Sequence, residues 1–137
     1  MLLELRNRLE DLALLERGLA RFAEEHALPA RELQNLNLVL EEIVTNLIEH
    51  AYDDEAEHAI RIRVALAGGE LRIEVEDDGR PFDPLAAPAP ELGTEPRERP
   101  IGGLGLHFVR RSVDALEHRR VGGRNLLRLR KRISTGD

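Results

Sequence analysis

The chain has 137 residues, and 20 lysine and arginine residues against 26 aspartate and glutamate residues give it a formal charge of −6. This length is typical of one domain, and a 42% share of hydrophobic residues is enough for a buried core. The absence of cysteine excludes disulfides and thiolate zinc sites, while the net acidity and an aromatic content of 3% argue against a nucleic-acid binder.

Two amphipathic helices are predicted in the first half of the chain. Residues 1–6 alternate loosely and are compatible with a short edge strand. From Leu9 to Phe22 apolar residues recur every three or four positions, which predicts a helix that ends before Pro29. A second helical pattern covers about residues 30–52.

The hydrophobic period then changes to two, which is the period of a β-strand. Residues 60–66 and 71–75 alternate apolar with mostly charged side chains on either side of a Gly-Gly pair. This pattern predicts an antiparallel hairpin with one buried face. A second hairpin, with its own Gly-Gly turn, is predicted over about 115–121 and 124–132.

A proline-rich segment separates the two hairpins. Six of the seven prolines fall within residues 79–102, with charged residues and glycines between them. A loop of this length in a compact domain is typical of a lid, a binding loop or a disordered linker. Helical spacing returns after Gly105.

The predicted elements follow the order helix, helix, hairpin, long loop, helix, hairpin. Strand pairs separated by helices, without strict β–α–β alternation, predict an α+β fold. We expect a two-layer α/β sandwich in which helices cover one face of a mostly antiparallel sheet. Residues 1–137 are expected to form a single domain.

The second predicted helix carries two polar side chains on an apolar background. Between Leu36 and Ile48, eight of 13 residues are large and apolar, which predicts a largely buried helix. Glu42 and Asn46 lie four residues apart and therefore share a face of it. Such a pair is compatible with a carboxylate base beside an oxygen ligand for Mg²⁺, and also with side chains that bridge neighbouring elements.

An aspartate stands at the end of the first predicted hairpin. Leu71, Ile73 and Val75 face the core, and Asp77 continues on the same side of the strand. With Gly79 after it, this carboxylate is placed to hold a hydrogen-bond donor at a pocket mouth, such as the exocyclic amine of a base. The same residues are also compatible with a simple turn.

Three glycines within four positions precede the last predicted helix. Gly102, Gly103 and Gly105 allow a ligand to approach the backbone closely. The amides at the N-terminus of the helix that follows favour an anion. A flexible hinge would use the same residues, so the segment alone leaves both interpretations open.

Taken in order, these three motifs resemble those of the histidine-kinase-like ATPases, also called GHKL or Bergerat-fold ATPases, which include gyrase B, histidine kinases and MutL. Within that family the chain is most similar to the small bacterial anti-sigma-factor serine/threonine kinases. The resemblance covers about residues 8–132. It implies an α/β sandwich that holds ATP between helices and a lid, here residues 84–101.

The resemblance also implies a role for each motif residue. Glu42 would be the general base of the N box, and Asn46 would be its Mg²⁺ ligand. Asp77 would bind the adenine amino group, with Gly79 beside it in the G1 box. The G2 box, whose backbone amides contact the phosphates, corresponds to Gly102, Gly103, Leu104, Gly105 and Leu106.

The chain departs from the family pattern at two positions. Pro81 stands where the G1 box usually has its second glycine. A proline fixes φ and lacks an N–H group, so the loop after Gly79 must differ locally. Before the last strand the family usually carries Gly-Thr, whereas this chain has Gly123-Arg124-Asn125, in which Asn125 is a candidate for a side-chain contact.

The remaining charged residues point to no second site. No two of the five histidines are spaced as His-x-x-x-His, which argues against zinc, and four of them follow a glutamate, which predicts exposed polar surface. His50, at the end of the second helix, is a candidate for facing the pocket. The basic residues within 128–132 are predicted to form mostly a solvated strand face rather than a nucleic-acid patch.

Functions of two different classes follow. The resemblance implies a cytoplasmic ATP-dependent kinase that phosphorylates a serine of a small anti-anti-sigma-type protein, sequesters a sigma factor, or does both, and that forms homodimers. The alternative is a catalytically inactive, nucleotide-gated module that binds a protein regulator. A detached ATP-binding half of a histidine kinase fits less well, because no helix pair with a phosphorylatable histidine precedes the domain. We expect no direct contact with nucleic acid and no membrane segment, since no apolar run approaches about 18 residues.

Overall fold

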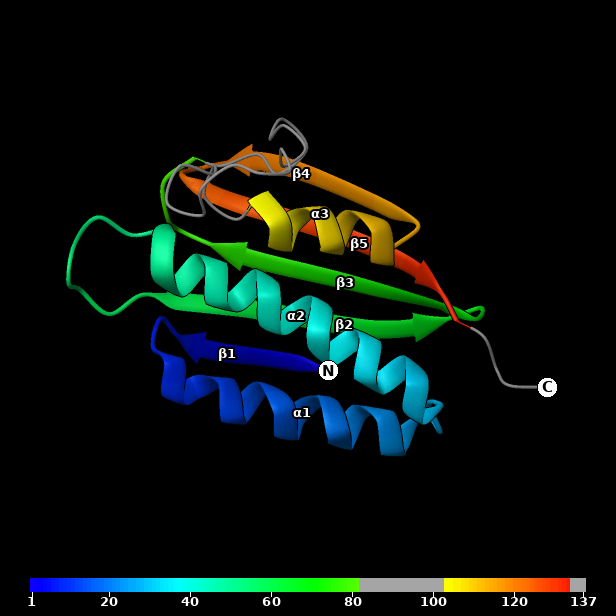
Figure 1. Ribbon diagram of the computed structural model, residues 1–137. Helices are drawn as coiled ribbons and strands as arrows, with labels where there is room; N and C mark the ends of the chain where they lie inside the picture. The colour runs from blue at the N-terminus through cyan, green and yellow to red at the C-terminus, as the bar shows by residue number, and fades with distance from the viewer. Residues whose placement is uncertain (82–102, 134–137) are drawn as a thin grey trace.

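Helices cover one face of an antiparallel sheet in the computed structural model, which describes residues 1–81 and 103–133 (Figure 1). The two-layer α/β sandwich predicted from the sequence is therefore confirmed. In chain order the elements are β1 (Leu2–Arg6), the short 3-10 helix η1 (Leu9–Asp11), α1 (Leu12–Glu25), α2 (Ala30–His50), β2 (Ala59–Ala67), β3 (Glu70–Asp77), α3 (Gly103–Ser112), β4 (Ala115–Val121) and β5 (Arg124–Arg132).

The sheet joins the N-terminal and C-terminal halves of the chain. Within the described residues its strand order is β1-β2-β3-β5-β4, and every pairing is antiparallel. Both predicted hairpins are present, as β2–β3 and β4–β5, and β1 is the predicted edge strand. Because β3 pairs with β5, the end of the first hairpin lies beside the start of the last strand, with Asp77 opposite Asn125.

The alternation of apolar and charged residues gives the sheet one buried and one charged face. In β2, Ile60, Ile62 and Val64 are fully buried, whereas Arg61 and Arg63 between them are exposed. A strand that alternates in this way turns all its apolar side chains toward one layer. The β2–β3 turn is closed by two glycines with positive φ, a conformation that other residues rarely adopt.

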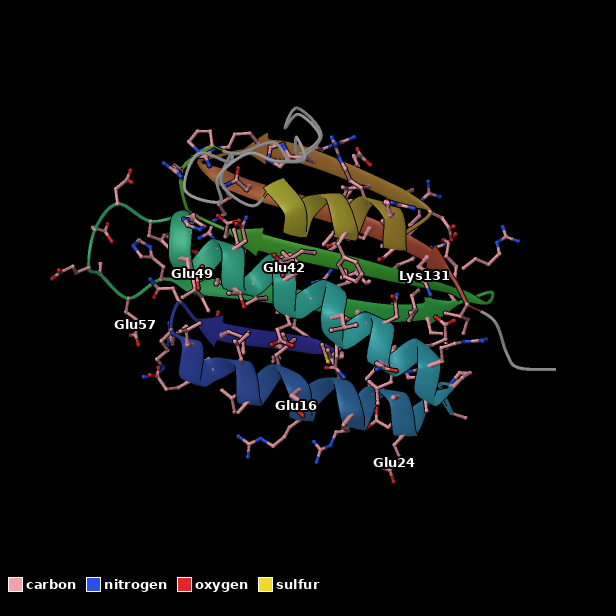
Figure 2. The ribbon with its side chains drawn as sticks, viewed as in Figure 1. Glu16, Glu24, Glu42, Glu49, Glu57 and Lys131 are labelled. Atoms are coloured by element: carbon pink, nitrogen blue, oxygen red, sulfur yellow. The ribbon has the colours of Figure 1, made fainter. Side chains whose placement is uncertain are left out.

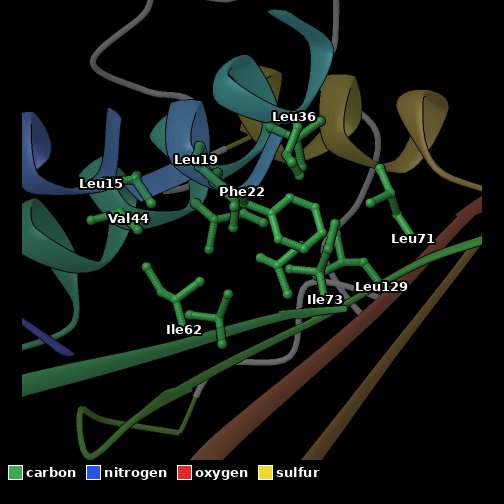
Figure 3. Packing of buried hydrophobic residues seen from close by; sticks show 14 of the residues in the cluster. Leu15, Leu19, Phe22, Leu36, Val44, Ile62, Leu71, Ile73 and Leu129 are labelled. Atoms are coloured by element: carbon green, nitrogen blue, oxygen red, sulfur yellow. The ribbon is translucent and has the colours of Figure 1, made fainter. Parts of the chain in front are cut away.

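The hydrophobic core lies between the helices and the buried face of the sheet. Figure 3 shows Phe22 of α1, Leu36 of α2, Ile73 of β3 and Leu129 of β5 pointing into this layer, and each is at most 2% exposed. Truncation of such a leucine to alanine costs about 2–5 kcal/mol of stability. This core fixes α2 against the sheet and thereby positions the polar side chains that α2 carries.

Three details differ from the sequence predictions. Leu38 is 49% exposed, so α2 is amphipathic and the prediction of a largely buried helix was wrong for that side of it. The last helix begins at Gly103, because its first turn includes the glycine motif. Lys131 belongs to the buried side of β5, where its Nζ atom lies 2.6 Å from Oε2 of Glu32 at the start of α2.

Candidate functional site

Asp77 ends β3 with its side chain turned inward, as its place in the strand predicts. The residue is 3% exposed, and its Oδ1 atom accepts hydrogen bonds from the backbone N–H of Gly79 at 2.8 Å and from Nδ2 of Asn125 at 3.1 Å. Burial raises the pKa of the Asp77 carboxyl, while the two hydrogen bonds oppose that rise. The site therefore holds a desolvated carboxylate in a fixed orientation.

Asn125 is the partner that fixes this orientation. It is 5% exposed on β5, and its Nδ2 atom also donates to the backbone carbonyl of Arg80 at 2.9 Å. The Nε2 atom of His118 on β4 lies 3.2 Å from Oδ1 of Asn125. The sequence contained a signal for this role, because Asn125 has the same strand parity as the core residue Leu129.

The turn after Asp77 is held from two sides. Arg120 of β4 donates from Nη1 to the Gly79 carbonyl at 2.7 Å, and the Arg80 N–H donates to the carbonyl of Ala51 at the end of α2 at 2.9 Å. A Cβ atom at position 79 would lie 2.7 Å from both Cβ and the carbonyl oxygen of Ala51, so only glycine allows this approach. The loop before Pro81 is thus held by one side-chain and one backbone hydrogen bond.

Glu42 and Asn46 lie one turn apart on α2, both partly exposed. Figure 2 shows Glu42 midway along α2, between the helix ends, and α2 packs against α3. Neither side chain makes a hydrogen bond or ion pair within residues 1–81 and 103–133. Because neither side chain is bonded to another described residue, both the carboxylate and the amide remain available to bind a ligand.

A second polar cluster joins the loop between α2 and β2 to Asp78, which follows β3. The two ring nitrogens of His58 lie 2.7 Å from Oδ1 of Asp54 and 3.1 Å from Oδ1 of Asp78, and the ring stacks on Tyr52 with centroids 4.3 Å apart. The hydrogen bond with Asp54 contributes most to the raised pKa of His58. The prediction of an exposed histidine was wrong here, because the His58 side chain is only 17% exposed.

Tyr52 stacks on His58 of this cluster and lies near the buried carboxylate of Asp77. Its hydroxyl is buried and has no hydrogen-bond partner in the part of the chain that the structure describes. Burial, followed by the nearby carboxylates of Asp77 and Asp78, raises the pKa of this phenol. No motif in the sequence pointed to Tyr52 or Asp54.

The glycine motif lies at the start of α3. Gly103, Leu104, Gly105 and Leu106 form its first turn, where the backbone N–H groups have no partner within the helix. Gly102 and the predicted lid, residues 84–101, lie outside the described residues. His50 at the end of α2 has its Nε2 atom 3.7 Å from Glu49.

Two further findings concern metal binding and membrane-spanning helices. In residues 1–81 and 103–133, no group of three histidine, aspartate or glutamate side chains is placed to hold a metal ion. Mg²⁺ commonly takes several of its oxygen ligands from bound phosphates and water rather than from protein side chains alone. No helix among the described residues is long and apolar enough to cross a membrane.

Comparison with known proteins points to one family. The profile of the "Histidine kinase-like ATPase domain" matches residues 5–131. The serine/threonine-protein kinase BtrW of Bordetella bronchiseptica is 29% identical over 88% of this chain and 78% of its own length. An anti-sigma F factor of a Thermoanaerobacter species is 27% identical over 85% of this chain and 81% of its own.

Solved structures support the same fold. The RsbU and RsbW domains of Rv1364c from Mycobacterium tuberculosis superpose with a TM-score of 0.69 at 19% identity, over 96% of this chain and 31% of that one. The chain also spans only 23% of the length of a blue-light-activated histidine kinase of Erythrobacter litoralis, to which it is 35% identical over 64% of its own length.

Proposed function

The chain belongs to the histidine kinase-like ATPase family, and from this premise we propose that it is an ATP-binding anti-sigma regulatory factor with protein serine/threonine kinase activity. Its substrate would be a serine of a small anti-anti-sigma-type protein, and a sigma factor would be the protein that it sequesters. Similarity to BtrW and to anti-sigma F factors over most of their lengths supports this function. Such a role would place the chain in the cytoplasm.

The observation that carries the proposal is the buried Asp77 carboxylate. Oδ1 is occupied by Gly79 and Asn125, while no hydrogen bond to Oδ2 is formed by the residues that the structure describes. A desolvated acceptor in a fixed orientation suits the exocyclic amine of adenine, because a buried acceptor rejects ligands that leave it unpaired. Guanine presents a carbonyl at the corresponding position, so Asp77 favours ATP over GTP.

The unused side chains of α2 fit the other end of the nucleotide. ATP would supply the transferable phosphoryl group, and Mg²⁺ would neutralise part of the charge on that group. Asn46 offers the amide oxygen that would hold the ion, and Glu42 offers a carboxylate that would orient the serine hydroxyl and accept its proton. Such positioning accounts for most of the catalysis of phosphoryl transfer. The first turn of α3, with Gly103 and Gly105, would bind phosphate oxygens through its backbone amides.

A kinase and a binding module differ in their dependence on Glu42. The test incubates the full chain and Glu42→Gln with Mg·ATP and a recombinant anti-anti-sigma-type protein, and measures phosphoserine by mass spectrometry. The proposal predicts phosphorylation by the wild type, and its loss in Glu42→Gln with nucleotide affinity retained. If no phosphoserine forms although the two proteins bind each other, the chain is a nucleotide-gated binding module instead.

A further inference from the structure

The face of the sheet opposite the helices is basic in an acidic protein. Its outward side chains include nine arginines and five glutamates, so its formal charge is +4, against −6 for the whole chain. These residues are Arg6, Arg61, Arg63, Arg72, Arg119, Arg124, Arg128, Arg130 and Arg132, with Glu4, Glu70, Glu74, Glu76 and Glu117. The described residues outside this face therefore balance it with an excess of negative charge.

On most of this face the strand register places each charged side chain opposite a side chain of the other sign. One row across the sheet places Arg61 between Glu4 and Glu76, and its Nε atom lies 3.1 Å from Oε1 of Glu4. The next row places Glu74 between Arg63 and Arg128, with Nε of Arg128 3.4 Å from Oε1 of Glu74. Opposite charges that face each other across strands stabilise a sheet.

The alternation breaks in the following row. Arg72 of β3 lies directly opposite Arg130 of β5, and Ala65 and Ala115 flank the two arginines on the outer strands. Among the residues that the structure describes, Arg72 pairs only within its own strand, with Glu70 at 3.2 Å. Arg130 has no side-chain partner within residues 1–81 and 103–133. Like charges directly opposite each other are destabilising, so this row costs stability that the other rows do not.

We propose that Arg72 and Arg130, called here the arginine pair, are the docking site for an acidic α-helix of a partner protein. Guanidinium groups bind carboxylates through two parallel hydrogen bonds, and two adjacent guanidiniums offer four such donors to one acidic segment. The alanines on both sides leave the row open. The pair lies on inner strands, where a partner strand cannot add to the sheet, whereas a helix packs across a sheet face.

The surrounding glutamates decide between classes of partner. Glu70 and Glu74 lie in the rows on both sides of the arginine pair. An extended polyanion such as nucleic acid would meet these carboxylates, whereas a helix with a few acidic residues would meet the arginines alone. Symmetric packing of this face on a second copy would bring two positively charged faces together, which disfavours that arrangement.

The test uses the full chain and a designed acidic helical peptide of about 15 residues, a length at which a peptide helix becomes appreciably stable. Backbone amide shifts are followed by NMR during the titration, at low salt. We expect shifts centred on Ala65, Arg72 and Arg130, and about tenfold weaker binding for Arg72→Gln combined with Arg130→Gln. The matched control is Arg61→Gln with Arg128→Gln, which removes the same charge from the same face and is expected to change affinity little.

Thermal unfolding provides a second measurement that does not need a ligand. Arg130→Gln relieves the repulsion from Arg72, so its unfolding midpoint is expected to equal or exceed that of the wild type. Arg128→Gln loses its ion pair with Glu74 and relieves no repulsion, so its midpoint is expected to fall below that of the wild type. Equal weakening of peptide binding by both double variants would overturn the proposal in favour of diffuse electrostatics. Tighter binding of a single-stranded oligonucleotide, or self-association that Arg130→Gln abolishes, would also overturn it. None of these measurements depends on nucleotide binding.

Discussion

Asn125 holds Asp77 across the β3–β5 pairing, with its side-chain amide 3.1 Å from the carboxylate oxygen. The same amide nitrogen binds the carbonyl of Arg80, so one side chain fixes both the buried acid and the turn that follows it. In the family pattern a Gly-Thr pair precedes the last strand. In this chain Asn125, the second residue of β5, supplies a side-chain contact to Asp77.

Asn125→Ala is predicted to lose nucleotide affinity and stability together. It leaves Oδ1 of Asp77 with one donor instead of two and the Arg80 carbonyl without its side-chain donor, which costs about 1–3 kcal/mol of unfolding free energy. Calorimetric titration with Mg·ATP should show at least about tenfold weaker binding. Asn37→Ala, at a partly exposed position on α2, is the control, and equal affinity of both variants would contradict the role of Asn125.

Two glycines are predicted to respond in opposite directions to alanine. Gly79→Ala forces a Cβ atom against Ala51 and should destabilise the protein and weaken nucleotide binding. At Gly18, within α1, a Cβ atom would lie 3.4 Å from Sδ of Met1, a contact that the flexible side chain can accommodate. Gly18→Ala should therefore stabilise the helix by about 0.5–1 kcal/mol. Urea unfolding of both variants measures the two signs.

His58 is predicted to make stability depend on pH near neutrality. Its pKa is raised in the folded state, chiefly by the hydrogen bond with Asp54. The stabilisation is therefore complete below the unfolded-state pKa of about 6.5 and is lost as pH rises through the folded-state pKa. Asp54, whose pKa is lowered by the same contact, loses its share only in acid.

The measurement compares urea unfolding at about pH 6 and about pH 8.5. The wild type should lose more stability over this interval than His58→Gln, which cannot be protonated. His26→Gln is the control, because His26 has no carboxylate partner within the described residues. An identical pH dependence in wild type and His58→Gln would show that the cluster with Asp54 and Asp78 contributes nothing.

Lys131 is predicted to stabilise the protein through one partner. Its bond to Glu32, which is 6% exposed, crosses from β5 to α2. Lys131→Met leaves this buried carboxylate unpaired and should cost about 1–3 kcal/mol. Arg130→Met, an exposed neighbour on the same strand, should cost less. The double variant Lys131→Met with Glu32→Leu should recover much of the loss, and additive effects of the two changes would argue against a direct pair.

Local pattern was sufficient to predict most of the fold. The strands of both hairpins, their Gly-Gly turns and the inward direction of Asp77 follow from alternation alone, because a strand exposes every second residue to the same side. The predicted helix boundaries lie close to the observed ones because the apolar residues recur with the helical period. The whole of α2 was predicted to be largely buried because apolar residues were counted around its full circumference, although Leu38 on its outer side is 49% exposed.

The contacts that complete the site could not be predicted, since they join distant parts of the chain. Strand parity predicts that Asn125 faces inward, but the register that places it opposite Asp77 depends on how β5 pairs with β3 and is not encoded locally. The same holds for His58 with Asp78, 20 positions apart, and for Lys131 with Glu32, 99 positions apart. Roles for Glu42 and Asn46 came from the motif, and they stay predictions.

The central claim is that Asp77 recognises adenine, and calorimetric titration of Mg·ATP into the wild type and Asp77→Asn tests it most directly. Asparagine has the same shape, so the fold should be retained, but its side chain can turn a donor toward the donor of adenine. We predict micromolar binding by the wild type, with Mg·GTP bound much more weakly, and loss of ATP binding in Asp77→Asn. Equal affinity of Mg·ATP for both folded proteins, or none for the wild type, would contradict the account.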